Sequence, residues 1–319
     1  MRVLLTGGAG FVGQWLARAL LARGDAVDLS GLGDTFSGPP VLTVDERRSV
    51  RWVTADVRDA DEVDLVVKQS RPDVIFHLAG VSFPPDAEHS PTAAYDINAL
   101  GAVRLLTAVR RGKLAGELDP TVVIVGSGMQ YGLHDASEMP LGENTPQWPL
   151  TMYAASKAAQ EVASLQFCRA SGVRVVCTRS FNHSGPGHGA QYLLPSLVAR
   201  ARQAATSERH TLVLGNDVVR DYLHVSDVVD AYLRLASHGV VGQSYNVASG
   251  VGVSVRELAA TVLLHAGVDA DISTDPSLVR STDIPVLVGS PMKLMRETGW
   301  TPIKTHADII DDLLHAATD

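Results

Sequence analysis

The chain has 319 residues, 45% of them hydrophobic and 19% charged, which is enough for a large core and a second, smaller domain. Its formal net charge of −8 argues against a protein that coats nucleic acid, and the sequence has no basic cluster. No run of about twenty apolar residues occurs, so no membrane span is expected.

The two cysteines, Cys168 and Cys177, lie in apolar surroundings and have neither CxxC nor Cys/His zinc spacing. We expect buried free thiols, no metal site and a reducing cytoplasm as the location. A strand predicted to begin within two residues of the N-terminus leaves no room for a signal peptide.

The first predicted elements are a short apolar strand, Arg2–Thr6, a glycine-rich turn, and a helix, Phe11–Arg23. Glycines at such a turn let the backbone approach a pyrophosphate closely, and the helix N-terminus presents N–H groups to the phosphates. The turn carries Gly7, Gly8, Gly10 and Gly13. The order of strand, turn and helix predicts a dinucleotide site, although glycine-rich turns alone are common.

Further strands and helices alternate along the chain, which indicates an α/β fold with a Rossmann-type, doubly wound parallel sheet. The predicted strands are Ala26–Ser30, Val50–Thr54, Val74–Leu78, Thr121–Gly126 and Val173–Thr178, with helices at about 59–70, 92–111 and 153–171. Ligands of such sheets bind beyond the carboxyl ends of the strands.

The alternation loosens after Pro186, where short strands (Leu212–Leu214, Ser244–Val247) alternate with helices and a last helix is predicted near 305–317. We therefore expect an NAD(P)-binding domain at 1–180, joined by about 219–248. Residues 181–218 and 249–319 are expected to form mainly a smaller, C-terminal substrate-binding domain.

The end of the second strand bears on the choice of cofactor. NAD-binding proteins usually carry an acid there, which bonds the ribose 2′-hydroxyl, whereas this chain has Ser30 and Gly31. NADP(H) is therefore favoured and NAD(H) remains possible. Arg47 and Arg48 are candidates for the 2′-phosphate only if the 34–48 loop folds back. Asp56 is placed to accept from the adenine amino group or, alternatively, to cap the following helix.

Tyr153 and Lys157 are four residues apart at the start of a predicted helix, and so lie on one face. A tyrosine with a pKa near 10 exchanges protons poorly at neutral pH. A nearby ammonium group and the positive charge of an oxidised nicotinamide are expected to lower that pKa toward neutrality. Ser127, at the end of another strand, offers a hydroxyl to a reacting carbonyl. The three residues predict a catalytic site, against the alternative of a surface helical pair.

With these motifs the chain resembles the extended short-chain dehydrogenases/reductases that act on nucleotide sugars, over essentially its whole length. The motifs are TGGAGFVG, Asp56-Val57, HLAG at 77–80, the helix of Asn98, VGSGMQYG, YAASK and RDYLHVSDV at 220–228. Within that superfamily, the segments at 179–187 and 275–300 are similar to GDP-4-keto-6-deoxy-D-mannose reductases, which form GDP-D-rhamnose.

The resemblance implies roles for individual residues: Tyr153 as proton donor, Lys157 as its electrostatic partner and Ser127 as the group that bonds the sugar oxygen. The residues expected to bind the cofactor are Gly7, Gly10, Phe11, Val12, Gly13, Gly31, Asp56, Val57, Leu78, Ala79, Gly80, Tyr153, Lys157 and Ser180. Those expected to bind the substrate are Ser82, Ser127, Asn182, Arg220 and Arg280.

Some of these roles have plain alternatives. Asn98 either supports a proton-relay water or only bends its helix. Arg220 and Arg280 suit a diphosphate because a guanidinium bonds phosphate oxygens with two hydrogens, but either could form a surface salt bridge. His77 is expected to be packed at a strand end, and His183 and His188 to lie in a loop with possible contact to the sugar.

The chain departs from its relatives at positions that bear on the reaction. Related 4,6-dehydratases carry an acid two residues after the strand-end serine or threonine, where this chain has Met129. Methionine cannot donate a proton, so elimination lacks its acid. The segments Arg179-Ser180 and Arg280-Ser281 stand where the similar reductases carry arginine-proline, and His188 stands where glutamine is usual. These differences leave the substrate's identity open.

The resulting expectation is NADPH-dependent reduction of the C4 ketone of a GDP-4-keto-6-deoxyhexose. The alternatives are a nucleotide-sugar 4-epimerase or 4,6-dehydratase with tightly bound NAD, and a redox sensor without catalysis. The nucleotide base and the configuration at C4 stay open. A homodimer is implied through the helices at 92–111 and 153–171, on small and apolar surface residues such as Ala154, Ala158, Ala159 and Leu165.

Overall fold

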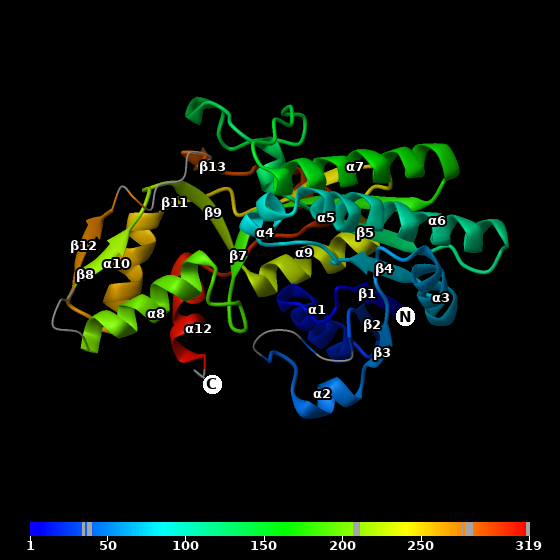
Figure 1. The fold of residues 1–319 in the computed structure, drawn as a ribbon, viewed down its shortest axis with the longest axis horizontal. Helices are drawn as coiled ribbons and strands as arrows, with labels where there is room; N and C mark the ends of the chain where they lie inside the picture. The colour runs from blue at the N-terminus through cyan, green and yellow to red at the C-terminus, as the bar shows by residue number, and fades with distance from the viewer. Residues whose placement is uncertain (34–35, 37–39, 207–210, 276, 278–282, 317–319) are drawn as a thin grey trace.

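The computed structural model describes residues 1–33, 36, 40–206, 211–275, 277 and 283–316. Within these residues the largest sheet has seven parallel strands in the order β10-β6-β5-β4-β1-β2-β3, which confirms the predicted doubly wound α/β fold. Figure 1 labels five of them, β5, β4, β1, β2 and β3. The strands are β1 (Arg2–Thr6), β2 (Ala26–Gly31), β3 (Arg51–Thr54), β4 (Val74–His77), β5 (Thr121–Ser127), β6 (Arg174–Ser180) and β10 (Ser244–Val247).

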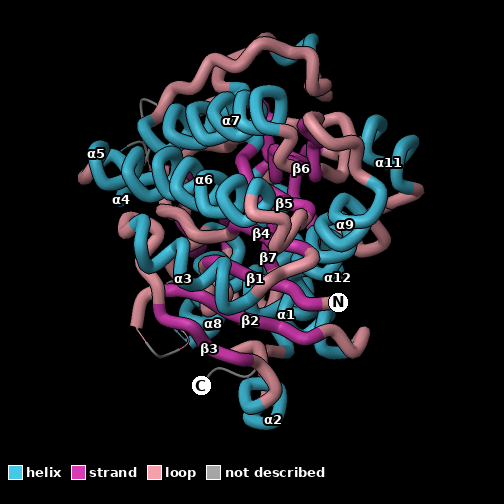
Figure 2. The backbone as a smooth tube through the Cα atoms, turned by 90° about the vertical axis from the view of Figure 1, so that its right-hand side faces the viewer, coloured by secondary structure: helices cyan, strands magenta, loops and turns pink. Residues whose placement is uncertain are grey.

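Helices cover both faces of this sheet, which explains why its central strands are buried on both sides. One face carries α1 (Phe11–Ala22), α9 (Val225–His238) and α11 (Met292–Thr298), and the other carries α3 (Ala60–Ser70), α6 (Gly101–Leu114) and α7 (Met152–Ser171) (Figure 2). Alternate residues of each strand enter the two cores. Leu5 and Phe76 pack against α1 and α9, whereas Leu4 and Ile75 pack against α3 and α6.

The helix predicted at 92–111 is divided into three parts. After α4 (Pro84–His89), α5 (Pro91–Tyr95) is joined to α6 by a π-helical turn at Asp96–Leu100. Such turns take one residue more than an α-helical turn, and a periodicity of 3.6 does not reveal them. Asn98 lies in this turn. The short α2 (Val44–Arg48) follows the loop after β2.

The described residues outside this sheet include two smaller sheets. Strand β9 (Val219–His224) pairs with β7 (Asn182–Ser184), β11 (Gly252–Ser254) and β13 (Val286–Leu287), and β8 (Thr211–Leu214) pairs with β12 (Asp271–Thr274). Helices α8 (Leu193–Thr206), α10 (Val255–Ala266) and α12 (His306–His315) share one apolar core beside them, at the left of Figure 1.

The predicted division into a cofactor domain and a substrate domain remains a prediction. In the region predicted at about 219–248, β10 pairs with β6 in the large sheet and α9 packs on α1, while β9, which precedes both, belongs to a smaller sheet.

Strand β1 lies between β2 and β4, so the order of the strands reverses direction at β1. In doubly wound sheets the crevice beyond the carboxyl ends of the strands at this point is where ligands bind. The loops after β1, β2, β4 and β5 all open at that edge.

Candidate active site

A cavity of about 990 Å³ lies at the carboxyl ends of the strands. This volume is at the upper end of the range for small-molecule sites. Every residue predicted to bind the cofactor lines it, and so do Ser82, Ser127 and Asn182 from the predicted substrate site. Arg220 does not line the cavity, and Arg280 lies outside the described residues.

The glycine-rich turn fits tightly against the neighbouring loop. Gly7 has a φ of +70°, and a Cβ there would lie 2.6 Å from the backbone nitrogen of Ala79. A Cβ on Gly13 would lie 2.6 Å from the carbonyl oxygen of Gly8. Side chains at these positions would push α1 away from the sheet and fill the space beside the turn, so glycine is required.

The N-terminus of α1 offers an anion site. Its N-cap, Gly10, is extended and provides no side-chain cap, so the first N–H groups of the helix have no side-chain acceptor. Unpaired N–H groups and the helix dipole favour a phosphate at such a position. Because Phe11, Val12 and Gly13 line the cavity, these residues fit the pyrophosphate of a dinucleotide.

We call the part of the cavity beyond β2 and β3 its adenosine end, because the adenosine of a dinucleotide is expected there. This end has an exposed apolar residue, Leu32, and an ion pair. Asp56 accepts hydrogen bonds from the backbone N–H and the Nε of Arg58, at 2.9 and 3.0 Å. The hydrogen bonds from Arg58 lower the pKa of Asp56. The helix-cap alternative for Asp56 is wrong, because Asp59 caps α3 by accepting from the N–H groups of Asp61 and Glu62.

Neither candidate arginine for the 2′-phosphate lines the cavity. Arg47 packs over the ring of Phe36, at 4.8 Å from its centroid, and Arg48 pairs with Asp45 on the surface of α2. Part of the loop that precedes them, 34–35 and 37–39, lies outside the described residues.

The three predicted catalytic residues meet in this cavity. Thr151 caps the N-terminus of α7, whose first two turns carry Tyr153 and Lys157. Ser127 ends β5, and its Oγ accepts from the N–H of Met129 at 3.2 Å. That oxygen also shares a hydrogen bond with the side chain of Tyr153. The serine and tyrosine hydroxyls therefore lie close enough to bond one substrate oxygen together.

Burial dominates the electrostatics of this group. Burial raises the pKa of Tyr153 to about 12, and the hydrogen bond with Ser127 offsets only part of that rise. Burial also lowers the pKa of Lys157 to about 8. The predicted lowering of the tyrosine pKa toward neutrality also depends on the positive charge of an oxidised nicotinamide, so it stays a prediction. The positive nicotinamide included in that expectation is not part of the chain.

Asn98 is fully buried and connects three segments of the site. Its Oδ1 accepts from the N–H of Val81 at 2.8 Å, and its Nδ2 donates to the Oγ of Ser156 at 2.8 Å. It lies in the π-helical turn between α5 and α6. The proton-relay role stays a prediction.

The loop after β7 supplies residues that sequence reasoning missed. The ring of His188 stacks between Phe11 and Tyr192, with centroids 4.5 and 4.2 Å apart, and Tyr192 shares a hydrogen bond with Ser82. Burial lowers the pKa of His188 to about 3, so the stack is uncharged at neutral pH. His183 and His188 both line the cavity, but His183 lies in β7 and not in a loop, because β7 pairs with β9 there. Tyr192 has no motif that marks it in the sequence.

Two arginines near the site bond to the protein itself. Arg220 is partly buried and donates to the carbonyl oxygens of Val219 and Ile284, at 2.9 and 2.6 Å. Its predicted contact with a diphosphate stays a prediction. Arg179 pairs with Glu161 in the interior, and its neighbour Ser180 shares a hydrogen bond with Tyr232 at the cavity wall.

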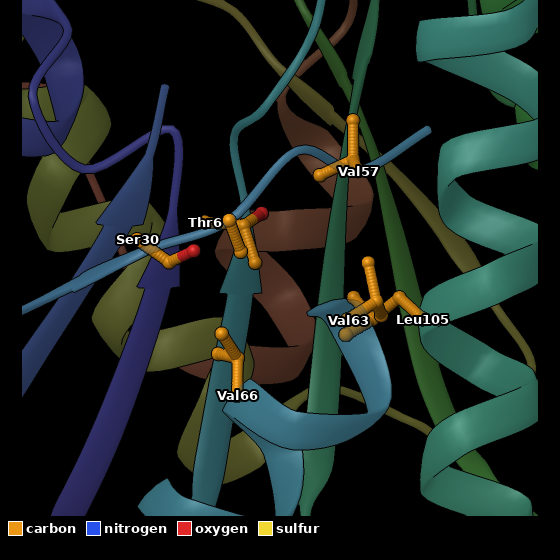
Figure 3. A pocket seen from close by; sticks show the side chains of 7 residues that line it. Thr6, Ser30, Val57, Val63, Val66 and Leu105 are labelled. Atoms are coloured by element: carbon orange, nitrogen blue, oxygen red, sulfur yellow. The ribbon is translucent and has the colours of Figure 1, made fainter. Parts of the chain in front are cut away.

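A second cavity, of about 10 Å³, lies beneath the adenosine end and holds at most one water. Figure 3 shows Thr6 and Ser30 at the ends of neighbouring strands on one side of it, with Val63 and Val66 of α3 opposite. The Oγ1 of Thr6 bonds to Nδ1 of His77, which is fully buried at the end of β4.

Among the described residues no group of three or more His, Cys, Asp or Glu side chains could hold a metal ion. Within the same part of the chain no helix combines the length and apolar character of a membrane span. Cys168 and Cys177 are free thiols, Cys177 being buried and Cys168 half-buried.

A doubly wound sheet with this glycine turn, serine, tyrosine and lysine defines an NAD(P)-dependent short-chain dehydrogenase/reductase. The chain belongs to the GDP-mannose 4,6 dehydratase family of extended enzymes of this class, whose family model matches residues 4–313. The similar proteins are enzymes named for nucleotide-sugar substrates, which argues against the redox-sensor alternative.

Similar proteins include both reductases and epimerases. GDP-6-deoxy-D-mannose reductase of Pseudomonas aeruginosa is 37% identical over 235 residues, covering 72% of this chain and 75% of that protein. The solved structure of RMD from Pseudomonas aeruginosa complexed with NADPH has a TM-score of 0.81 and 32% identity, covering 98% of each chain. The UDP-glucose 4-epimerase of Thermus thermophilus, solved with NAD, has a TM-score of 0.81 and 28% identity, covering 99% of this chain and all of that one (100%).

Proposed function

We propose that the protein is an NADPH-dependent reductase that converts the C4 ketone of a GDP-4-keto-6-deoxyhexose into an alcohol, giving GDP-D-rhamnose or a close isomer. The similarity to GDP-6-deoxy-D-mannose reductase supports this substrate class. The serine, tyrosine and lysine in one cavity support the reaction type.

The observation that carries the proposal is the side chain two residues after Ser127. Met129 lines the cavity there, and among the described lining residues the one carboxylate is Asp56, which is paired with Arg58 at the adenosine end. A 4,6-dehydratase needs an acid near the sugar to protonate the leaving hydroxyl. A thioether cannot do so, whereas reduction of a ketone needs only one proton donor, which is Tyr153.

In the proposed reaction Ser127 and Tyr153 both bond the ketone oxygen. The reduced nicotinamide supplies the hydride when it is bound. Tyr153 gives its proton to the oxygen as negative charge develops there, and Ser127 holds that oxygen in line. Lys157, whose Nζ donates to the carbonyl oxygen of Val125 at 2.8 Å, stabilises the resulting phenolate.

The preference for NADP(H) rests on the end of β2. Ser30, Gly31 and Leu32 line the cavity there, and the ion pair of Asp56 and Arg58 follows β3. None of the three residues at the end of β2 repels a 2′-phosphate, and none provides the carboxylate that bonds the 2′-hydroxyl of NAD. The RMD structure with NADPH supports the same choice, whereas the epimerase structure with NAD keeps NAD(H) as the alternative.

The test is to supply GDP-4-keto-6-deoxymannose with NADPH or NADH and to follow absorbance of the reduced nicotinamide. We expect stoichiometric oxidation of NADPH and a faster rate than with NADH. No oxidation of either cofactor would overturn the proposal. Affinities for GDP, dTDP and UDP, ranked by calorimetry, would decide the nucleotide base.

A nucleotide-sugar 4-epimerase is the second candidate, supported by the similarity to UDP-glucose 4-epimerases. An epimerase returns its hydride to the substrate and consumes no added cofactor. Interconversion of UDP-glucose and UDP-galactose without added NAD(P)H would favour this candidate. Net consumption of NADPH with the keto sugar favours the reductase.

A homodimer through α6 and α7 is part of the proposal. Exposed apolar residues on this side include Tyr95 and Leu100 before α6 and Val162 on α7, the last being 64% exposed. Ala154, expected at this surface, is instead buried within the chain, because its side of α7 faces the interior. Light scattering at micromolar concentration is expected to give the mass of two chains, and a monomer would contradict it.

A further inference from the structure

A buried polar cluster lies behind Ser127, on the side away from the cavity. Its members Gln130, Glu161 and Arg179 are 0%, 4% and 6% exposed. None of them lines the cavity, and the proposed reaction gives them no chemical step. Because burying polar and charged groups is costly unless they are fully paired, the cluster calls for a structural or functional reason.

The first contact joins Gln130 to Ser127. The chain after Ser127 forms one turn of 3₁₀-helix, Gly128–Tyr131, and the side chain of Gln130 folds back so that its Oε1 accepts from the N–H of Ser127 at 2.7 Å. A Cβ on Gly126 would lie 2.5 Å from that Oε1. Because Gly126 has no Cβ, the side chain of Gln130 has room to reach the backbone of Ser127. One fully buried amide therefore holds the N–H of Ser127.

The second contact joins Gln130 to the helix that carries Tyr153. The Nε2 of Gln130 donates to Oε2 of Glu161 at 2.9 Å. Glu161 is four residues after Lys157 and eight after Tyr153, so the three residues share one face of α7. One amide thus connects the end of β5 to the catalytic face of α7.

The third contact fixes Glu161 itself. Arg179 of β6 donates to it twice, from Nε at 3.0 Å and from Nη2 at 2.7 Å. Burial alone would raise the pKa of Glu161, but the hydrogen bonds and charge of Arg179 outweigh it and lower that pKa. The carboxylate is therefore a permanent acceptor, with its orientation set by a planar, two-point contact.

We propose that Gln130 is a positioning residue, held by Glu161 and Arg179, that fixes the hydroxyl of Ser127 against the phenol of Tyr153. The inference rests on the proposed function, because it concerns how the same site is assembled. Its physical reason is that two groups must bond one oxygen, and a misplacement of about 1 Å can cost on the order of a hundredfold in rate.

The test replaces the amide without a large change in volume. Gln130→Met removes both hydrogen bonds, and Gln147→Met is the matched control. Gln147 also contacts Glu161, at 3.0 Å, and Gln130, at 3.3 Å, but has no hydrogen bond to Ser127. Gln130→Asn, which is too short to reach Ser127, is the second variant in case the first does not fold.

The decisive measurement is the pKa of Tyr153, because a merely structural role would leave it unchanged in a folded variant. Carbon-13 at the tyrosine Cζ is titrated upward from neutral pH with oxidised cofactor present, and the resonance is assigned by its loss in Tyr153→Phe. The hydrogen bond with Ser127 lowers this pKa. Gln130→Met is expected to raise it, and adding Ser127→Ala is expected to raise it no further.

In kinetics Gln130→Met is expected to lower kcat about 10- to 100-fold with little change in KM, whereas Gln147→Met changes kcat less than about threefold. An unchanged Tyr153 pKa in folded Gln130→Met, or an equal effect of both variants, would overturn the inference. The titration needs no substrate. If the wild-type protein oxidises no NADPH, the proposed function fails while the titration still decides this inference.

Discussion

Lys157 donates from its ammonium group to the carbonyl oxygen of Val125, 2.8 Å away, and so ties α7 to β5 two residues before Ser127. The same nitrogen donates to Oε1 of Gln160 at 3.1 Å. This lysine is almost fully buried and has no carboxylate as hydrogen-bond partner among the described residues, and burial lowers its pKa to about 8. The residue that we propose assists catalysis therefore also opposes folding when it is charged.

The stability of the protein is predicted to rise with pH above about 8. The unfolded lysine titrates near 10.4, so between about 8 and 10.4 the unfolded state binds more protons than the folded state. The free energy of unfolding then increases with pH, by on the order of 2–3 kcal/mol from this group. Urea unfolding across that range measures it. Lys157→Met should remove this increase, and an identical pH slope in the variant would contradict the prediction.

Tyr153→Phe is predicted to lower kcat about 10²- to 10⁴-fold, because the variant keeps the ring and loses the proton donor. Binding of NADPH, measured by quenching of protein fluorescence, should stay within a few-fold of wild type, since Phe still fills the cavity wall. The control is Tyr95→Phe, which changes a more exposed ring before α6. Near-normal turnover of Tyr153→Phe would remove this tyrosine from its role.

Much of this fold was predictable because its signals are local. The run Val74–Leu78 and the glycines after β1 identify a buried strand and a phosphate turn without knowledge of the rest of the chain. The candidate catalytic residues were predicted for the same reason. Tyr153 and Lys157 are one helical turn apart, and Ser127 directly ends a strand.

What the sequence did not reveal depends on contacts between distant segments. Arg179 and Glu161 are 18 residues apart and form their pair only when β6 and α7 pack together. Tyr192 reaches Ser82 from 110 residues away. The rise that burial causes in the pKa of Tyr153 was not foreseen, because desolvation depends on the whole fold, whereas the lysine four residues away can be read from the sequence. The π-helical turn at Asn98 has no periodic signal.

His77 is predicted to make the protein sensitive to acid. Burial, and to a smaller degree the charge of Lys157, lowers its pKa to about 3, while an unfolded histidine titrates near 6.5. Between these values the unfolded state binds more protons, so the free energy of unfolding falls as pH falls from about 6.5 toward 3. His77→Asn should reduce that loss, measured by urea unfolding at stepwise lower pH. His188→Gln should also reduce the loss of unfolding free energy at low pH, because burial lowers the pKa of His188 to about 3 as well.

Gly31→Asp is predicted to shift the cofactor preference from NADP(H) to NAD(H). Gly31 lines the adenosine end of the cavity at the end of β2, and a Cβ there would lie 3.3 Å from the far edge of the Trp52 ring, a contact that a small ring movement relieves. A carboxylate at this position would repel a 2′-phosphate and accept from a 2′-hydroxyl. Two like charges 4 Å apart repel by about 1 kcal/mol in water and about 4 kcal/mol at an effective dielectric constant of 20.

The dissociation constant for NADPH should therefore rise at least about fivefold in Gly31→Asp, since 1.4 kcal/mol corresponds to a factor of ten. The constant for NADH should stay the same or fall. Gly31→Ala is the matched control, because it adds the same Cβ beside Trp52 without the charge. Fluorescence titration with both cofactors measures all four constants. If the alanine and aspartate variants weakened NADPH equally, the steric contact would explain the change, and the 2′-phosphate would not lie beside Gly31.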